Sequence, residues 1–446
     1  MKQQHHRKLF FWLLPATVAS CLLFVALFLA LKGQEKPLKS IALVKQPTQE
    51  VASQDVATLV QGNTKFALDL YKQISSQTPA TANVFFSPYS VSSALAMTAA
   101  GARGNTATQM NQVLSFSLPP NTLHPGFGKL NYQLTNAQGY QLSIANRLWV
   151  QNNFPLLPAF EKITNDFYGA KVASLDFGNG EEAAEEINLW VSQRTQNQIK
   201  DLLGCPLGKN TKLVLTNAIY FKGNWQEKFE SKDTKEEPFI LASGKQEKVP
   251  LMYQSNHFSY GEAENLQVLE MPYKGNLSMV ILLPAKPDGL PDLERNLTTA
   301  NLEKWLSLSP ENVEVWLPKL KFDRRFNLKT TLSQMGMVDA FEETGKADFS
   351  GITNQPNLYI KDVVHKAFVE VDESGTKAVA ATAVVMCDGP CPVTAASPAS
   401  SKLFRADRPF LFLIKDQKSG SILFMGRFVN PNPDKQEEPP CEEDRN

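Results

Sequence analysis

The sequence predicts an α+β fold, because helical and extended patterns occupy different parts of the chain. Apolar residues recur at helical spacing through much of the first half, while alternating or continuously apolar runs dominate the second half. No internal repeat is visible, and 43% of the residues are hydrophobic, which can support a large core. Helices and strands that segregate along the chain are typical of the α+β class.

The two ends of the chain are predicted to lie outside the folded domain. Residues 9–31 carry no charge and follow Lys2, Arg7 and Lys8, so this run is long enough to span a bilayer with the basic flank in the cytoplasm. Residues 1–31 are therefore predicted to be a signal anchor or signal sequence. A retained signal anchor, a cleaved signal sequence and lipidation at Cys21 are the three alternatives. All three predict an extracytoplasmic protein, membrane-anchored or secreted, and the membrane is an expected partner through this segment.

One domain is predicted between a linker and a tail. Residues 32–55 are rich in Lys, Gln and Pro without periodicity, which is typical of a linker. Residues 432–446 are acidic and Pro-rich and are expected to be disordered. The domain between them, residues 56–431, is expected to be a monomer.

The first half is predicted to be mainly helical. Apolar spacing predicts helices over 58–74, 89–101, 106–114 and 183–195, and a loop over 115–126. Short strands are expected at 83–88, 142–150 and 213–221.

The second half is predicted to be mainly strands. Residues 266–273 and 277–283 form an expected pair around Lys274-Gly275-Asn276, and a strand is expected over 313–322. A helix over 328–335 should end at Gly336. Residues 410–415 and 422–429 are the last expected strands.

One segment, residues 364–385, combines a strand with a break and a run of small residues. The strand pattern covers 367–371, and Glu373-Ser374-Gly375-Thr376 then interrupts it. Residues 376–385 fit an Ala-rich helix or a linker as well as a second strand. As a strand, one face would carry only small, uncharged side chains, namely Thr376, Ala378, Ala380, Thr382 and Val384.

The chemistry of an enzyme is not visible in this chain. It has no Gly-x-Ser-x-Gly, no His-Glu-x-x-His, no phosphate-binding loop and no complete dinucleotide fingerprint. The 45 basic and 45 acidic residues balance, so no nucleic-acid partner is expected. Cys387 and Cys391 have no flanking His, and we expect neither a metal nor a cofactor.

Several separate motifs resemble the serpin family and occur in that family's order. They are Asn83-Val84-Phe85-Phe86-Ser87-Pro88, Leu215-Thr216-Asn217-Ala218 through Trp225, Leu317-Pro318-Lys319-Leu320, Gly336-Met337-Val338-Asp339, residues 364–385, Phe404-Arg405-Ala406-Asp407-Arg408-Pro409, and Phe424-Met425-Gly426-Arg427. The resemblance implies three β-sheets with surrounding helices and an exposed reactive-centre loop. It also implies a suicide-substrate inhibitor of serine endopeptidases, with cysteine endopeptidases as a further target class. In that mechanism the cleaved loop inserts into the central sheet and traps the acyl-enzyme.

The resemblance assigns roles to residues at three places. The hinge and inserting loop would contain Glu373, Gly375, Thr376, Ala378, Ala380 and Thr382. The family's "shutter", a buried polar cluster under the sheet, would contain Ser87, Ser90, Asn217 and His365. Its "breach", where the loop enters, would contain Trp225, Lys319 and Glu373.

The bond that the target cuts is predicted less closely. Counting from Glu373 as is usual in the family gives Gly389-Pro390, yet the segment before Pro409 is longer than is typical. The candidate scissile region therefore comprises Met386, Cys387, Asp388, Gly389, Pro390, Val393 and Thr394. Neutral residues there favour elastase-, subtilisin- or chymotrypsin-like targets over trypsin-like ones.

Three alternatives stay open. Cys387 and Cys391 could close a small ring through a turn at Asp388-Gly389-Pro390, or remain two free thiols. A non-inhibitory serpin, acting as a chaperone or carrier, is the alternative within the family. A surface adhesion or scaffold protein is the alternative outside it.

Overall fold

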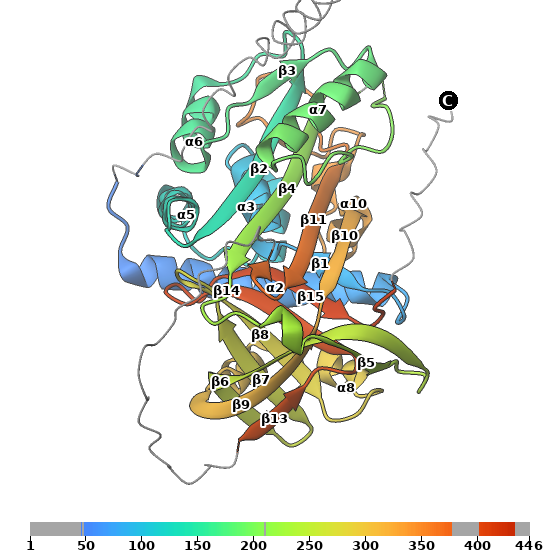
Figure 1. The fold of residues 1–446 in the computed structure, drawn as a ribbon. Helices are drawn as coiled ribbons and strands as arrows, with labels where there is room; N and C mark the ends of the chain where they lie inside the picture. Colours follow the sequence, from blue (N-terminus) through green and yellow to red (C-terminus); the bar gives the residue numbers. More distant parts are fainter. Residues whose placement is uncertain (1–45, 47–48, 209–210, 377–400, 433–446) are drawn as a thin grey trace, which may run out of the picture. The chain divides into compact units, whose positions relative to one another are not determined.

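The structure is a computed structural model that describes residue 46 and residues 49–208, 211–376 and 401–432 (Figure 1). The described residues all belong to one compact unit, Leu43–Asn446. The predicted signal or anchor segment 1–31, the inserting residues Ala378, Ala380 and Thr382, the candidate scissile region and residues 433–446 lie outside the described residues.

Helices surround strands throughout this unit (Figure 1). The helices are α2 (Ser53–Gln77), α3 (Pro88–Ala99), α4 (Gly104–Val113), α5 (Pro120–Thr135), α6 (Pro158–Tyr168), α7 (Gly180–Arg194), α8 (Leu290–Arg295), α9 (Thr299–Trp305) and α10 (Lys329–Gln334), with short 3₁₀ turns at Ser231–Asp233 and Asp339–Phe341. The strands are β1 (Val84–Phe86), β2 (Tyr140–Gln151), β3 (Ala173–Leu175), β4 (Leu213–Asn224), β5 (Lys235–Ile240), β6 (Gln246–Ala263), β7 (Leu266–Pro272), β8 (Leu277–Pro284), β9 (Ser309–Pro318), β10 (Leu320–Asn327), β11 (Val363–Asp372), β12 (Gly375–Thr376), β13 (Lys402–Arg405), β14 (Phe410–Asp416) and β15 (Ile422–Phe428). The predicted α+β class is confirmed.

A six-stranded sheet has the order β10-β11-β12-β4-β2-β3. β11 pairs with β10 from Val364 to Val371 and pairs with β4 in parallel only from Val363 to Ala367. β12 lies between β11 and β4 beyond that point. The α7 helix lies against one face of this sheet (Figure 1), where its apolar residues pack on β2 and β4.

The remaining described strands form a nine-stranded sheet with the order β1-β15-β14-β8-β7-β6-β9-β13, to which β5 adds along β6. The three sheets that we expected are thus two in the described residues. The reason is the 18-residue strand β6, which pairs with β5, β9 and β7 in turn and so joins two groups of strands.

The α3 helix shows how the sequence fixes an element under the six-stranded sheet. Pro88 occupies the first turn, where its missing N–H is harmless, and the Ser87 side chain caps the helix by accepting from the Ser90 amide at 3.2 Å. Eleven of its residues are buried, so the helix has no solvent-exposed face. Its first turn therefore presents Ser87 and Ser90 to the sheet.

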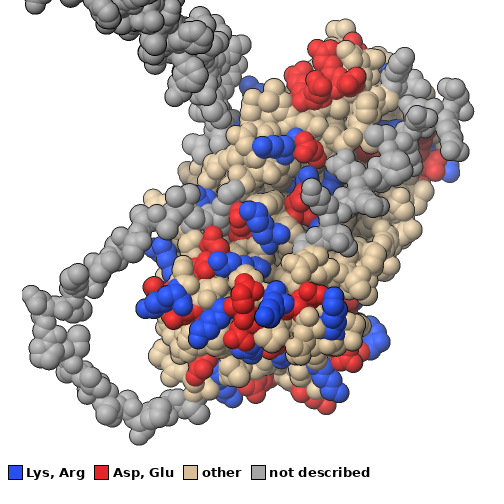
Figure 2. All heavy atoms as spheres, turned by 45° about the vertical axis from the view of Figure 1, so that its right-hand side comes forward, with Lys and Arg blue, Asp and Glu red and all other residues tan. Residues whose placement is uncertain are grey.

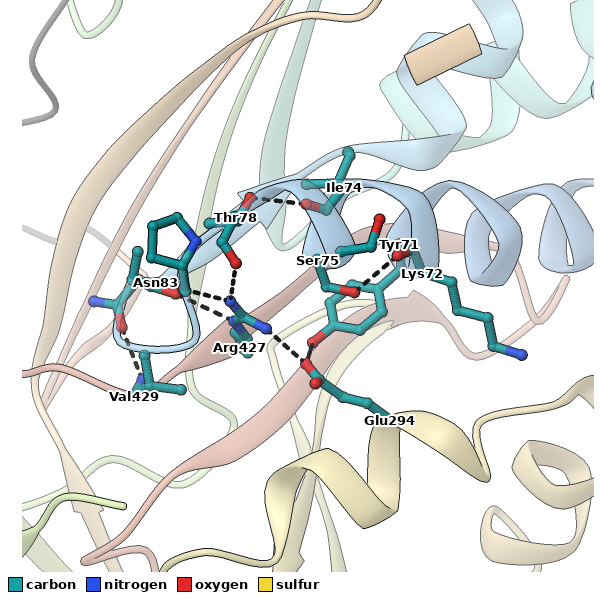
Figure 3. A network of polar contacts seen from close by, with 12 residues as sticks. Tyr71, Lys72, Ile74, Ser75, Thr78, Asn83, Glu294, Arg427 and Val429 are labelled. Atoms are coloured by element: carbon teal, nitrogen blue, oxygen red, sulfur yellow. Dashed lines mark hydrogen bonds and ion pairs between the residues drawn. The ribbon is translucent and has the colours of Figure 1, made fainter. Parts of the chain in front are cut away.

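A buried polar network connects the end of α2 to β15 (Figure 3). The Arg427 guanidinium donates to Glu294 at 3.0 Å and to the carbonyls of Thr78 and Pro79 at 3.3 and 2.8 Å. The Tyr71 hydroxyl donates to the same Glu294 oxygen at 2.5 Å. Only 4% of the Arg427 side chain is exposed, so these partners must stabilise its buried charge in place of water.

Two element predictions are wrong. Residues 120–126, predicted as loop, begin α5: Pro125 cannot donate to the Asn121 carbonyl, which accepts from Gln49 at 3.2 Å instead. The strand predicted over 313–322 is two strands, β9 and β10, on different sheets. The chain changes sheet at Lys319, whose amide donates to the Pro250 carbonyl.

Candidate functional site: the hinge in the six-stranded sheet

The hinge predicted at residues 373–376 lies within the six-stranded sheet. Gly375 and Thr376 pair antiparallel with Asp372 and Val371 of β11 on one side. On the other side they pair antiparallel with Asn224 and Gly223 of β4. The chain has therefore already entered the gap between β11 and β4 by two residues.

Asp372 closes the turn that leads from β11 into β12. Its Oδ1 accepts from the Ser374 amide at 2.8 Å, from the Gly375 amide at 3.2 Å and from the Ser374 hydroxyl. Aspartate side chains stabilise tight turns in this way. The chain consequently reverses and returns along β11.

Gly375 is the residue that passes closest to β4. Its φ is +142°, which L side chains rarely adopt. A Cβ at this position would lie 2.1 Å from the Gly223 carbonyl oxygen and 2.6 Å from the Asn224 Cα. Any other side chain would force the hinge away from β4.

Lys319 and Glu373 form an ion pair beside the turn, with 2.7 Å between Nζ and Oε1. The Thr234 hydroxyl donates to the same oxygen at 2.8 Å. Burial raises the pKa of Glu373, but hydrogen bonds from Lys319, from its own backbone and from Thr234 outweigh this and hold the pKa below its ordinary value. Because Lys319 is 38% exposed, we expect the pair to contribute about 1 kcal/mol or less.

The segment after β4 binds three consecutive hinge carbonyls. The Trp225 indole donates to Asp372 O at 3.0 Å, the Phe229 amide to Glu373 O at 2.9 Å, and the Trp225 amide to Ser374 O at 2.9 Å. The residues predicted for the breach are thus in contact around the hinge. Thr234 and Phe229 were not predicted.

Tyr273 connects the hinge to the other sheet. Its ring stacks on Trp225 with 4.4 Å between centroids, and its hydroxyl lies 3.0 Å from the Thr376 hydroxyl. Burial raises the pKa of Tyr273 above its ordinary value, so the hydroxyl stays neutral and can donate. The sequence offered no motif that pointed to this residue.

The four residues predicted for the shutter lie together where α3 meets β4 and β11, and all are fully buried. The Ser87 amide donates to His365 Nε2 at 2.9 Å, and His365 Nδ1 hydrogen-bonds Asn217 Oδ1. Because Nε2 is an acceptor, the proton of the neutral ring is on Nδ1. Burial lowers the pKa of His365 to about 3, so the ring is neutral near pH 7.

Asn146 of β2 completes this cluster and was not predicted. Asn217 Nδ2 donates to Ser90 Oγ at 2.6 Å and to Asn146 Oδ1, and Asn146 Nδ2 donates to the Ser90 carbonyl at 3.3 Å. The cluster therefore joins α3 to three strands of the six-stranded sheet. How these bonds change during function stays a prediction.

The C-terminal root of the loop is fixed to the nine-stranded sheet. β13 pairs in parallel with β9, so that Lys402 is opposite Val313 and Arg405 is opposite Trp316. Lys402 contacts Glu262 at 3.3 Å, and Arg405 contacts Glu237 at 3.1 Å and Asp407 at 2.9 Å. Both basic residues therefore belong to ordered strand structure.

Charged side chains of both signs are interspersed over much of the face in Figure 2, and an acidic group lies at its upper end. This face carries no basic stripe of the kind that binds nucleic acid. Within the described part of the chain, no three His, Cys, Asp or Glu side chains are placed to hold a metal ion.

A family model described as serpin (serine protease inhibitor) matches residues 61–431. The chain belongs to the serpin family. The family is described as one of serine protease inhibitors, and the protein is a protease inhibitor rather than an enzyme.

Relatives of known name resemble the whole domain. The human leukocyte elastase inhibitor is 43% identical over 389 residues, which cover 84% of this chain and 99% of that protein. Human serpin B4 is 41% identical over 398 residues, which cover 84% of this chain and 100% of that protein. The crystal structure of uncleaved ovalbumin matches with a TM-score of 0.75 at 30% identity, over 84% of this chain and 100% of ovalbumin.

These relatives correct one prediction, the extracytoplasmic location. That prediction rested on the apolar run 9–31 alone. In contrast, leukocyte elastase inhibitor and serpin B4 align over nearly their whole length with 84% of this chain. Similarity to these proteins contradicts an extracytoplasmic serpin, whether membrane-anchored or secreted, and we withdraw both the location and the membrane partner. Among the described residues, no helix combines the length and apolarity that a membrane span requires.

Proposed function

We propose that this serpin is a suicide-substrate inhibitor of serine endopeptidases. The nucleophilic serine oxygen of the target attacks the carbonyl carbon of the scissile bond in the loop. The C–N bond breaks, and the new amine leaves with a proton supplied by the base of the target. The target is then held as an ester on the N-terminal half of the loop.

The position of β12 is the observation that carries this proposal. Gly375 and Thr376 already pair with strands on both sides, so further insertion only extends an existing ladder. Each added residue gains ladder hydrogen bonds, which contribute a net of about 0.5–1.5 kcal/mol apiece. Insertion of the cut loop would therefore be favourable and would carry the attached protease with it.

The register of β12 also supports insertion, because it can be continued without conflict. Six residues beyond Thr376 is Thr382, six residues before its partner Val371 is His365, and six residues before its other partner Gly223 is Asn217. His365 and Asn217 are themselves paired across β11 and β4. A continued strand therefore has one register that suits both neighbours.

In that register Thr382 would separate His365 from Asn217. Insertion of a strand doubles the spacing between β11 and β4 from about 4.8 Å to about 9.6 Å, so the direct bond between the two side chains would break. The Thr382 hydroxyl could accept from His365 Nδ1–H and donate to Asn217 Oδ1. The buried cluster would then remain hydrogen-bonded in the inserted state.

The inward face of the inserting strand would also suit its site. Thr376, the first inserted residue, is buried, and the alternate residues of β11 from Val363 to Val371 that face the same way are buried as well. Small, uncharged side chains at Ala378, Ala380 and Thr382 would pack there without an unpaired charge. This favours an inhibitor over a non-inhibitory chaperone or carrier.

Complex formation tests the proposal directly. The protein is incubated with elastase-, subtilisin-, chymotrypsin- and trypsin-like enzymes, and the mixtures are separated by electrophoresis in detergent. An inhibitor gives a covalent band at the summed mass of the protease and the N-terminal part of the serpin. Cleaved serpin with no such band for any enzyme would favour the chaperone or carrier alternative.

A further inference from the structure

Besides its backbone pairing, Thr376 has one side-chain hydrogen bond within the described residues. It is 2% exposed, and its hydroxyl lies 3.0 Å from the Tyr273 hydroxyl. Tyr273 lies between β7 and β8 of the nine-stranded sheet and forms an isolated backbone bridge with Trp225, whereas Thr376 lies in the six-stranded sheet. The contact therefore joins the two sheets at the first inserted residue.

The Tyr273 ring is fixed by its neighbours. It stacks on Trp225 with an interplanar angle of 8°, and Phe221 meets it edge-on with 5.1 Å between centroids. Trp225 in turn binds the Asp372 and Ser374 carbonyls. The hydroxyl is consequently aimed at Thr376 by rings that also hold the hinge backbone.

We infer that Tyr273 is a positioning residue that holds the hinge in the sheet of the uncut inhibitor. This inference rests on the proposed function and deepens it. With Thr376 held in place, insertion begins from a strand whose first two residues are already paired. Without the contact, only the backbone bonds would hold the hinge, so it would leave the sheet more often and insertion would begin less readily after each cut.

The chemistry of the pair gives a diagnostic pattern. When one hydroxyl is removed, the other stays buried without a partner, which is costly; when both are removed and the shapes are kept, the change is nearly neutral. Tyr273→Phe keeps the ring stack, and Thr376→Val keeps the shape of the side chain. Each single change should therefore release the hinge, and the double change should restore it.

Hydrogen exchange followed by mass spectrometry tests this without any protease. In the peptide that contains residues 373–377, each single variant should exchange about tenfold faster than the parent. The double variant should exchange near the parent rate. Tyr260→Phe should leave this peptide unchanged. It removes the hydroxyl of a buried tyrosine that donates to Glu262 at 2.7 Å, away from the hinge.

Parent-like exchange in the single variants, or a double variant as fast as the singles, would overturn the inference. With a protease that the parent traps, the number of inhibitor molecules consumed per trapped enzyme should rise in each single variant and fall back in the double. A merely structural loss would not be repaired by the second substitution. If the parent traps no protease, the proposed function fails while the exchange experiment still decides the role of Tyr273.

Discussion

His365 and Asn217 face each other across β11 and β4, and the protonated Nδ1 of the neutral histidine donates to the asparagine oxygen. This bond crosses the seam at which we propose that the loop inserts. Both residues are fully buried, so a charged imidazolium there would lack solvent and a carboxylate partner among the contacts described. The neutrality of His365 is therefore a condition for the resting sheet.

We predict that this condition makes stability depend on pH. The folded pKa of His365, about 3, lies below its ordinary value of 6.5, so the unfolded chain takes up the proton first as the pH falls. The contribution of the neutral His365 to stability is present in full above pH 6.5 and is lost as the pH falls from 6.5 to 3. At pH 5 this one group should lower the free energy of unfolding by about 2 kcal/mol, measured by urea denaturation.

Two other titratable groups must be separated from His365 in that measurement. Burial lowers the pKa of His124 to about 4, so it titrates over much of the same interval, and His124→Phe should remove its share of the slope. Glu373, whose pKa is lowered by its hydrogen bonds, loses its contribution only below pH 4.5. His365→Asn should be less stable at pH 7 but flatter from pH 7 to 5, and a slope equal to the parent's would contradict the prediction.

The sequence motifs located the site better than local patterns located its strands. Lys319 contacts Glu373 at the hinge, and His365 contacts Asn217 in the buried cluster, because each motif occupies a fixed place in this fold. β12 could not be predicted, since two residues carry no periodicity and their partners in β4 lie about 150 positions earlier in the chain. The choice between strand, helix and linker for residues 376–385 depends on such distant partners.

Residues without a motif were missed for a related reason. Tyr273, Thr234 and Asn146 act through side-chain contacts that only tertiary packing creates. A tyrosine at the end of an apolar strand is ordinarily a core residue, and Tyr273 is indeed fully buried. Only the position of its hydroxyl, next to Thr376, distinguishes it.

A charge at the first inserted residue should abolish trapping. Thr376→Arg places a guanidinium where the native side chain is 2% exposed, at a cost of several kcal/mol. Cleavage by the target should continue while covalent complexes disappear, as measured by the molar ratio of serpin to protease needed for full inhibition. Thr376→Ser keeps the hydroxyl and should behave like the parent. Complexes at the parent ratio in the arginine variant would rule out insertion as the trapping step.

Removal of Arg427 should destabilise the domain without touching the hinge. Arg427→Met leaves Glu294 without its cation and the Thr78 and Pro79 carbonyls without their donor. Breaking a buried ion pair from one side costs about 3–5 kcal/mol, which chemical denaturation would detect. Arg295→Met is the matched control, because its ion pair with Asp292 is 70–74% exposed and should change stability by about 0.5 kcal/mol or less. Equal effects of the two variants would show that the buried network is not needed for stability.

The root of the loop limits where a target can cut. Lys402 and Arg405 are strand residues paired with β9 and held by carboxylates, so their backbone would have to leave the sheet before it could enter a protease cleft. Between Ser374 and Ser401 the only basic residue is Lys377, directly after the paired Thr376.

A trypsin-like enzyme therefore lacks a suitable bond, because its specificity pocket needs a basic side chain to pair with its carboxylate. We predict faster complex formation with elastase-, subtilisin- or chymotrypsin-like enzymes and a cut near Met386, Cys387, Val393 or Thr394. N-terminal sequencing of the released C-terminal fragment locates the bond, and association rates with the four enzymes rank the targets. Lys402→Gln should leave that ranking unchanged, since the residue only anchors β13. A fragment that begins directly after Lys402 or Arg405, together with rapid trapping of trypsin, would show that the root opens in solution and would overturn both the site and the specificity.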